Sequence, residues 1–204
     1  PLSCESRTPF KSISGGVTAP SGFRAAAIDC GIKNPDVRRL DLTLIVSDHP
    51  THTEAVFTTN QVKAACVRVS AQHMREPDIR AIIANSGNAN ACTGPRGIQD
   101  AKAMTKAAAE ALGIRMRQVL VCSTGIIGMS MPIERILPQV APLAGKLHAK
   151  GSDEAAQAIM TSDTRPKTFA IEVPCGGGSF RVGGIAKGAG MICPNMATML
   201  CFIT

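Results

Sequence analysis

The chain has 204 residues and is 45% hydrophobic, which is enough apolar material for one ordinary domain or one large lobe of a bigger body. Its net charge of +7 comes from 22 Lys and Arg that are spread along the sequence without stacking aromatic residues between them, and this argues against a nucleic-acid-binding protein. No apolar stretch reaches the roughly 18 residues that a transmembrane helix needs.

Eight cysteines and four histidines are present, and no pair of cysteines forms a CxxC motif. This pattern argues against a zinc site, and we expect no metal. Most of the cysteines lie in apolar runs, which favours buried free thiols in a reducing compartment. We therefore expect a cytoplasmic protein, or an organellar one if the source is a eukaryote.

The first part of the chain predicts a loop followed by strands. Glycine and proline lie close together in residues 15–24, which is typical of a loop. Apolar and β-branched residues predict strands over 41–48, 54–60 and 62–70. Residues 79–87 form a short apolar run that ends in small polar residues, and we expect a strand that leads into a functional loop.

The middle of the chain predicts two helices around a buried strand. Residues 99–113 carry apolar side chains at helical spacing and end in glycine, a good stop signal. Residues 118–125 read as a buried strand followed by a turn of small residues. A further helix is predicted to start near Pro132 and to be interrupted by Pro138 and Pro142.

The last third predicts a helix, a hairpin and a final strand. Ser152 is expected to cap a helix that has two acidic residues in its first turn. Residues 168–174 and 179–186 alternate around a glycine-rich turn, as in a hairpin. Residues 196–204 are nearly all apolar and predict a buried strand. Because such a strand would lack partners, we expect the chain to be one domain portion, the N-terminal half of a longer protein.

Three segments could carry chemistry, and each also has a plain structural interpretation. The small residues of 122–128 could present backbone N–H groups to an oxyanion, or could simply end a strand. Lys187 lies among glycines in 183–195, which fits a substrate-binding lysine, a weak nucleotide cradle without Walker spacing, or a solvated lysine at a hairpin edge. Thr198, in 194–200, would ordinarily be an unremarkable strand residue.

Together these segments are far more specific than they are apart. The chain contains, in this order, GGVTAPSGFRAAA, AVFTTN, VKAA, NSGNANACTG, CSTGIIG, AIMTSDTRPK and GGIAKGAGMICPNMATML. From about Gly15 to its last residue it resembles the ornithine acetyltransferase family, also called the glutamate N-acetyltransferase family. The resemblance implies a layered α/β (α+β) sandwich of the ornithine acetyltransferase or DmpA-like type.

The resemblance also implies that a precursor cuts itself between Ala197 and Thr198. Residues 1–197 would then be the first chain and 198–204 the start of the second, in an α2β2 heterotetramer with no nucleic-acid or membrane partner. The hydroxyl of Thr198 would be the nucleophile, and its newly freed α-amine, with a pKa of about 8, would be the base.

The implied reaction moves an acetyl group from N2-acetylornithine to glutamate through acetyl-Thr198. The resemblance places the oxyanion hole at Thr124 and Gly125, and substrate contacts at Thr161, Lys187 and Thr198. No cofactor is implied, and acetyl-CoA stays open as a second acetyl donor. Asn85, Asn88 and Asn90 are expected to line the cleft, without an assigned role.

Three alternatives remain open on the sequence. An aminopeptidase or amidohydrolase of related fold would use the same threonine with water as the acceptor. A glycine-rich nucleotide-binding module would bind ATP around Lys187 without needing Thr198. A non-catalytic interaction subunit would be indifferent to the loss of the Thr198 hydroxyl.

Overall fold

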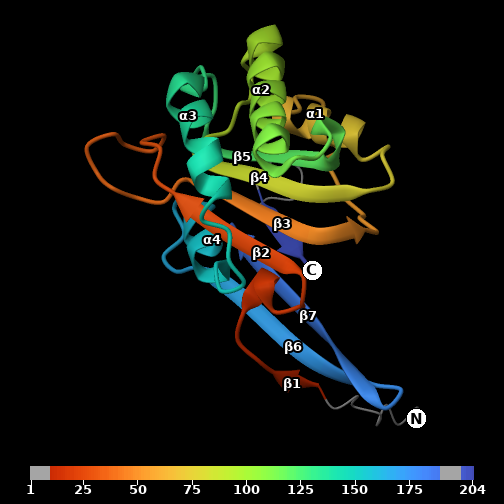
Figure 1. The fold of residues 1–204 in the computed structure, drawn as a ribbon. Helices are drawn as coiled ribbons and strands as arrows, with labels where there is room; N and C mark the ends of the chain where they lie inside the picture. Colours follow the sequence, from red (N-terminus) through yellow and green to blue (C-terminus); the bar gives the residue numbers. More distant parts are fainter. Residues whose placement is uncertain (1–9, 189–198) are drawn as a thin grey trace, which may run out of the picture.

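Two four-stranded sheets pack face to face in the computed structural model, which describes residues 10–188 and 199–204 (Figure 1). The first sheet has the order β2-β3-β4-β5, with antiparallel pairing except between β4 and β5, which are parallel. Its strands are β2 (Phe23–Ile28), β3 (Leu42–Thr51), β4 (Ile79–Asn88) and β5 (Val119–Ile126).

Three helices cover the outer face of the first sheet, at the top of Figure 1. They are α1 (Ala65–His73), α2 (Gly94–Leu112) and α3 (Ile133–Ala144), and the short 3-10 helix η2 (Met116–Gln118) precedes β5. The core between the helices and the sheet is aliphatic, with fully buried Leu44, Ile83, Met104 and Ile136. This arrangement fits a composition with only 3% aromatic residues.

The second sheet is wholly antiparallel and has the order β1-β6-β7-β8. Its strands are β1 (Lys11–Ser12), β6 (Lys167–Cys175), β7 (Gly178–Lys187) and β8 (Leu200–Ile203). The sheets meet in a small apolar cluster that also takes in α4 (Ser152–Ala158) and the 3-10 helix η1 (Gly16–Thr18), with Ile45, Ala156 and Ile185 among its members.

Helix α1 holds the outer edge of β5 by hydrogen bonds to its backbone. The Ser70 hydroxyl accepts from the Val121 N–H at 2.9 Å and donates to the Val121 carbonyl at 2.7 Å, while His73 Nδ1 contacts the Val119 carbonyl. The first half of this edge is thereby closed by a helix rather than by a strand.

Most predicted elements are confirmed. Strands β3, β4 and β5 lie at the segments predicted at 41–48, 79–87 and 118–125. Strands β6 and β7 contain all residues of the predicted hairpin strands, 168–174 and 179–186. Helix α2 ends at Gly113, which has the left-handed φ of 64° expected for such a stop. The final strand is confirmed for Leu200–Ile203, whereas 189–198 lie outside the described residues.

Two predicted strands are wrong. Residues 54–60 form neither helix nor strand, and residues 62–70 lie largely in helix α1. The buried residues of α1 are Ala65, Cys66, Val69, Ser70 and His73, a helical spacing that the β-branched valines of this segment obscured. The loop prediction for 15–24 also missed the start of strand β2.

The predicted interruption of the third helix is wrong as well, because α3 runs continuously through Pro138 and Pro142. Both prolines are on the exposed side, opposite the buried Ile136, Val140 and Leu143. The carbonyls that lose a helical partner therefore face solvent, where water can bond them.

Ser152 is not the N-cap of α4, since Gly151 takes that position and no side chain caps the helix. Instead, the Ser152 hydroxyl accepts a hydrogen bond from the buried Val17 N–H at 3.1 Å. This bond joins η1 to α4, two elements that are far apart in the sequence and that both pack into the cluster where the sheets meet.

Replacing Ser152 with alanine is expected to lower the free energy of unfolding of the full-length protein by about 1–3 kcal/mol, because the Val17 N–H would be buried without an acceptor. Urea unfolding measures this loss. Ser179→Ala is the matched control, because its exposed hydroxyl bonds only Glu172 and its removal should change stability by no more than about 0.5 kcal/mol. Equal losses in the two variants would contradict the interpretation.

Candidate functional site

Lys187 is the last residue of β7 and is 5% exposed. Its ammonium donates to the Thr161 hydroxyl at 2.8 Å and to the Thr124 hydroxyl at 3.2 Å. These three residues come from β7, from the loop after α4 and from β5, so the structure brings together three of the predicted site residues. The interpretation of Lys187 as a solvated lysine at a hairpin edge is therefore wrong.

The ammonium of Lys187 is suited to hold an anion. A lysine has three N–H donors, and two of them are directed at the threonine hydroxyls. Burial lowers the pKa of Lys187, the negative charge of Asp163 opposes this shift, and the positive charge of Lys167 adds to it. Thr161 is exposed whereas Thr124 is 1% exposed, so the ammonium joins a surface residue to a buried one.

Thr124 points into the space between the sheets because of the alternation along β5. Val121 lies in the core under the helices and Cys122 packs against the cluster between the sheets. Ser123, beside Cys66 of α1, faces the helices again, so Thr124 faces the second sheet. The register of one buried strand thus selects Thr124, rather than Ser123, as the partner of Lys187.

Gly125 follows Thr124 at a close crossing of two strand ends. Its φ of 138° disfavours other residues, and a Cβ atom there would lie 2.3 Å from the carbonyl carbon of Gly87 in β4. A β-bulge at Gly87 and Asn88 disturbs the register at the same point. Backbone groups can therefore approach a ligand here without a side chain in the way.

Asp163 is a buried carboxylate that sequence reasoning missed. Its Oδ1 accepts from the Gly188 N–H at 2.9 Å and from Lys167, and its Oδ2 accepts from the Thr161 N–H at 3.2 Å. Burial acts to raise the pKa of Asp163, but these hydrogen bonds outweigh it and bring the pKa to about 2. The one sequence feature that could have identified Asp163 is its position two residues after Thr161, within the same motif.

Thr198 and the predicted cleavage site, Ala197–Thr198, lie outside the described residues. Leu200 pairs with Lys187 in the register of β7 and β8.

The three asparagines have structural partners rather than a place in the lysine cluster. The Asn85 amide donates to the Asn88 carbonyl, and the Asn88 amide donates to the carbonyls of Met129 and Ser130. Asn90 accepts from Thr93 and donates to Gly97. These bonds fix the loop after β4, and the expected cleft role stays a prediction.

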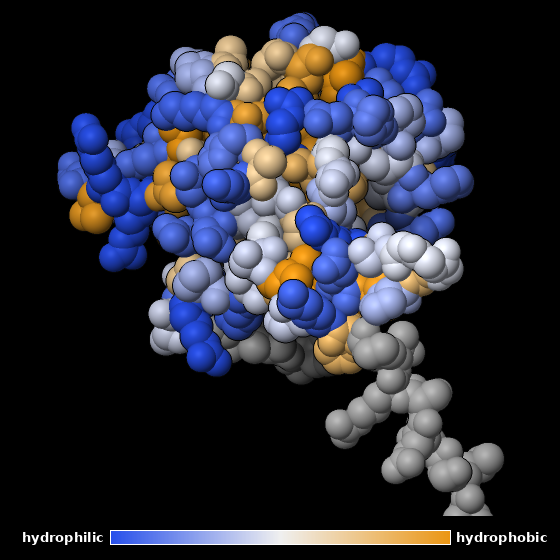
Figure 2. Space-filling view, turned by 60° about the horizontal axis from the view of Figure 1, so that its bottom comes forward, coloured by the Kyte–Doolittle hydropathy of each residue, from blue (hydrophilic) through white to orange (hydrophobic). Residues whose placement is uncertain are grey.

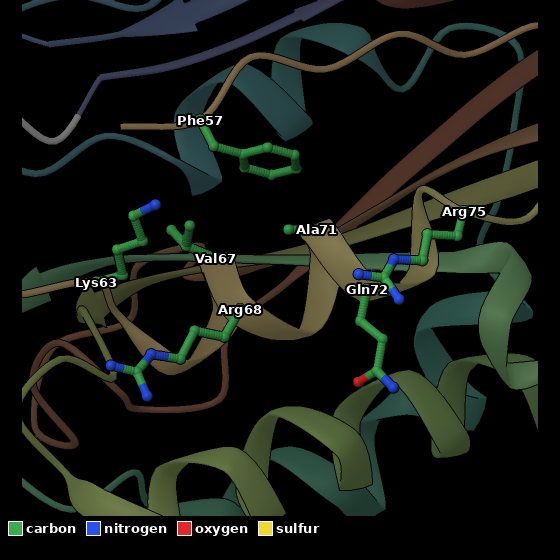
Figure 3. A pocket seen from close by; sticks show the side chains of 7 residues that line it. All are labelled: Phe57, Lys63, Val67, Arg68, Ala71, Gln72 and Arg75. Atoms are coloured by element: carbon green, nitrogen blue, oxygen red, sulfur yellow. The ribbon is translucent and has the colours of Figure 1, made fainter. Parts of the chain in front are cut away.

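A separate cavity of about 540 Å³ lies between α1 and the irregular segment before it (Figure 3). Lys63, Arg68 and Arg75 give it a basic lining, with Phe57 on the opposite side. None of the predicted site residues lines this cavity.

The spread positive charge of the chain is largely surface charge. Hydrophobic and hydrophilic residues are interspersed on the face shown in Figure 2. Arg24 pairs with Asp48, and both Arg115 and Arg117 pair with Glu76. Within 10–188 and 199–204, no group of acidic, histidine or cysteine side chains could hold a metal ion, and no helix has the length and apolarity to cross a membrane.

Two solved structures share this fold. The crystal structure of the arginine biosynthesis bifunctional protein ArgJ from Bacillus halodurans has a TM-score of 0.87 at 39% identity, covering 94% of this chain and 100% of that chain. The ornithine acetyltransferase from Mycobacterium tuberculosis, complexed with ornithine, has a TM-score of 0.84 at 43% identity, covering 93% and 100%. The predicted fold is confirmed: this is a two-sheet α/β protein of the ornithine acetyltransferase type.

The sequence comparisons define the family. The ArgJ family model matches residues 24–204. The arginine biosynthesis bifunctional protein ArgJ of Geobacter sulfurreducens is 50% identical over 182 residues, which are 89% of this chain and 46% of that protein. The protein of the same name from Parasynechococcus marenigrum is 43% identical over 205 residues, 100% of this chain and 50% of that protein. The chain belongs to the ArgJ family, as the resemblance predicts, and spans about half the length of these curated relatives.

Replacing Gly125 with alanine is expected to destabilise the full-length protein by more than about 4 kcal/mol, because the new Cβ would overlap the Gly87 backbone. Gly128→Ala, just after β5, is the control, since Gly128 also has a positive φ, of 80°, but open space around it. That control should lose only about 1–2 kcal/mol from backbone strain. Urea unfolding compares the two, and similar losses would show that the close crossing does not constrain the site.

Proposed function

We propose that the whole protein is an acyltransferase that moves an acetyl group from N2-acetylornithine to glutamate. The observation that carries this proposal is the buried Lys187 ammonium, held between the hydroxyls of Thr124 and Thr161. Membership of the ArgJ family supports it, as does the name of the ornithine-bound relative from Mycobacterium tuberculosis.

Lys187 suits both substrates because each of them carries an α-carboxylate. One N–H of the ammonium would pair with that carboxylate while the two threonine hydroxyls hold the side chain in place. A shared carboxylate contact also fits an exchange reaction, in which ornithine must leave before glutamate occupies the same place.

In the proposed chemistry, the Thr198 hydroxyl attacks the acetyl carbonyl and passes its proton to the Thr198 α-amine. The carbon–nitrogen bond then breaks, and ornithine leaves with that proton on its amine. The neutral glutamate amine attacks acetyl-Thr198 in turn and gives a proton to the Thr198 α-amine. The carbon–oxygen bond then breaks, that proton returns to the threonine oxygen, and N-acetylglutamate leaves. Each half passes through a tetrahedral oxyanion, for which we propose Thr124 and Gly125 as the binding site.

Self-cleavage between Ala197 and Thr198 would create the amine that this mechanism needs. The lengths of the matched proteins support such processing. The chain matches only 46–50% of the two curated relatives above, yet it matches 100% of each solved chain. Polypeptides of about this extent therefore occur as separate chains in those two structures.

The surface of the second sheet supports a partner chain derived from the rest of the precursor. Among the described strands, β8 has a neighbour on one side only. Phe169 and Ile203 lie on either side of Gly184 in the register and are 49% and 65% exposed. We propose that the second chain covers this apolar face, in an α2β2 heterotetramer.

We propose a cytoplasmic location, or an organellar one in a eukaryote, since the six cysteines of the described residues are free thiols. The proposed reaction uses no cofactor. Acetyl-CoA is the second donor to test: supplying it in place of acetylornithine asks whether the acetyl-Thr198 intermediate has two sources.

Thr198→Ala in the full-length precursor is expected to abolish cleavage and to lower acetyl transfer by at least about 10³-fold, because the nucleophile is gone. Intact mass measures the cleavage, and the paired release of ornithine and N-acetylglutamate measures the transfer. Thr198→Ser keeps a hydroxyl and should retain both. If the wild type releases acetate without N-acetylglutamate, the protein is a hydrolase instead. If Thr198→Ala stays uncleaved and is still active, the proposed mechanism is wrong.

Lys187→Met is expected to raise KM about 10- to 100-fold for both substrates, which is the usual effect of losing a hydrogen bond to a charged group. Steady-state kinetics in each substrate measures this change. Lys150→Met, at an exposed lysine, is the control and should leave both KM values unchanged. A Lys187→Met effect confined to one substrate would contradict a shared carboxylate contact.

A further inference from the structure

Asp163 joins the two backbone segments that carry the substrate-binding side chains. Its Oδ2 accepts from the N–H of Thr161 itself, and its Oδ1 accepts from the N–H of Gly188, the residue after Lys187. Its side chain is 0% exposed, so these bonds are shielded from competing water. One carboxylate thus fixes the distance between the loop after α4 and the end of β7.

The charge of Asp163 also acts on Lys187. Lys167 of β6 donates to the same carboxylate, and its side chain is 43% exposed. The charged groups that act on Lys187 from the surrounding elements are therefore Asp163 and Lys167, while Thr124 and Thr161 contribute neutral hydroxyls. Lys33, on the loop after β2, also lies in the field of Asp163.

We propose that Asp163 is a positioning residue: by bonding the backbone of Thr161 and of Gly188, it keeps the Thr161 hydroxyl and the Lys187 ammonium placed for the substrate carboxylate. This role rests on the proposed acetyl transfer and adds a residue that does not touch the substrate. The buried ammonium loses hydration, and a fixed negative charge behind it compensates for that loss. Lys167 balances the charge of the carboxylate from the outer side.

The sign of each charge gives opposite expectations for two variants. In Asp163→Asn, the negative charge that favours the protonated Lys187 is gone, so the pKa of Lys187 falls further. Substrate binding needs the charged amine, so the alkaline limb of kcat/KM should move to lower pH. In Lys167→Met, a positive charge that disfavours protonation is gone, so the alkaline limb should move to higher pH.

The experiment measures kcat and KM for acetylornithine and glutamate from neutral to alkaline pH, using the full-length, self-processed protein. We expect Asp163→Asn to raise both KM values about tenfold at neutral pH, with a smaller change in kcat, and to shift the alkaline limb downward. Lys167→Met should shift it upward. Asp153→Asn, an exposed aspartate of α4, is the control and should match the wild type.

A second readout does not depend on turnover or on a well-folded Asp163→Asn. Lys187 is acylated with a small amine-reactive reagent at a series of pH values, and peptide mass measures the extent. The midpoint of that pH dependence reports the pKa of Lys187 in the wild type and in Lys167→Met. The proposal is overturned if the midpoint pH of Lys187 acylation in Lys167→Met is lower than in the wild type or unchanged. It is also overturned if Asp163→Asn and Lys167→Met are both active and have the same KM values and pH profiles as the wild type. A wild type that is cleaved but transfers no acetyl group would instead overturn the proposed function, and the role of Asp163 with it.

Discussion

A positive charge buried between two sheets is the constraint on which this site depends. The Lys187 ammonium is costly to bury unless hydrogen-bond acceptors and a counter-charge surround it. Thr124 of β5 supplies one of these groups, and Thr161 and Asp163 of the loop after α4 supply the others. The sheets therefore have to meet in one register, because sliding β5 by one residue would replace Thr124 with a side chain from the other face.

The sequence predicted most elements whose pattern is unambiguous. Helix α2 has a long apolar stripe and a glycine stop, and the β6–β7 hairpin alternates around a glycine turn. Helix α1 was missed because it is short and rich in valine, and its buried polar residues make sense only against β5. Ser70 looks like a poor core residue until its hydroxyl is seen to bond the Val121 backbone. Such long-range partners cannot be inferred from local periodicity.

The site shows the same division between local and long-range information. Thr124, Thr161 and Lys187 came from motifs that resemble one family, and composition alone could not have joined residues 63 positions apart. Asp163 stood inside one of those motifs, but nothing local marks it as buried. Its importance appears only when Gly188 is found beside the loop after α4. The role of Thr198 as the nucleophile stays a prediction, because this residue lies outside the described part of the chain.

Glycine and small residues explain why so polar a site can sit in a packed interior. Gly125 lets the end of β5 approach the Gly87 backbone of β4 at a distance that a Cβ on Gly125 would prevent, and Gly184 leaves room for the Phe169 ring in the second sheet. The core between the sheets is correspondingly small, with alanines at many of its positions. A small core contributes little hydrophobic stabilisation. Much of the precision of the site must therefore come from directed hydrogen bonds, and those of Asp163 join the same two segments as the bond from Lys187 to Thr161.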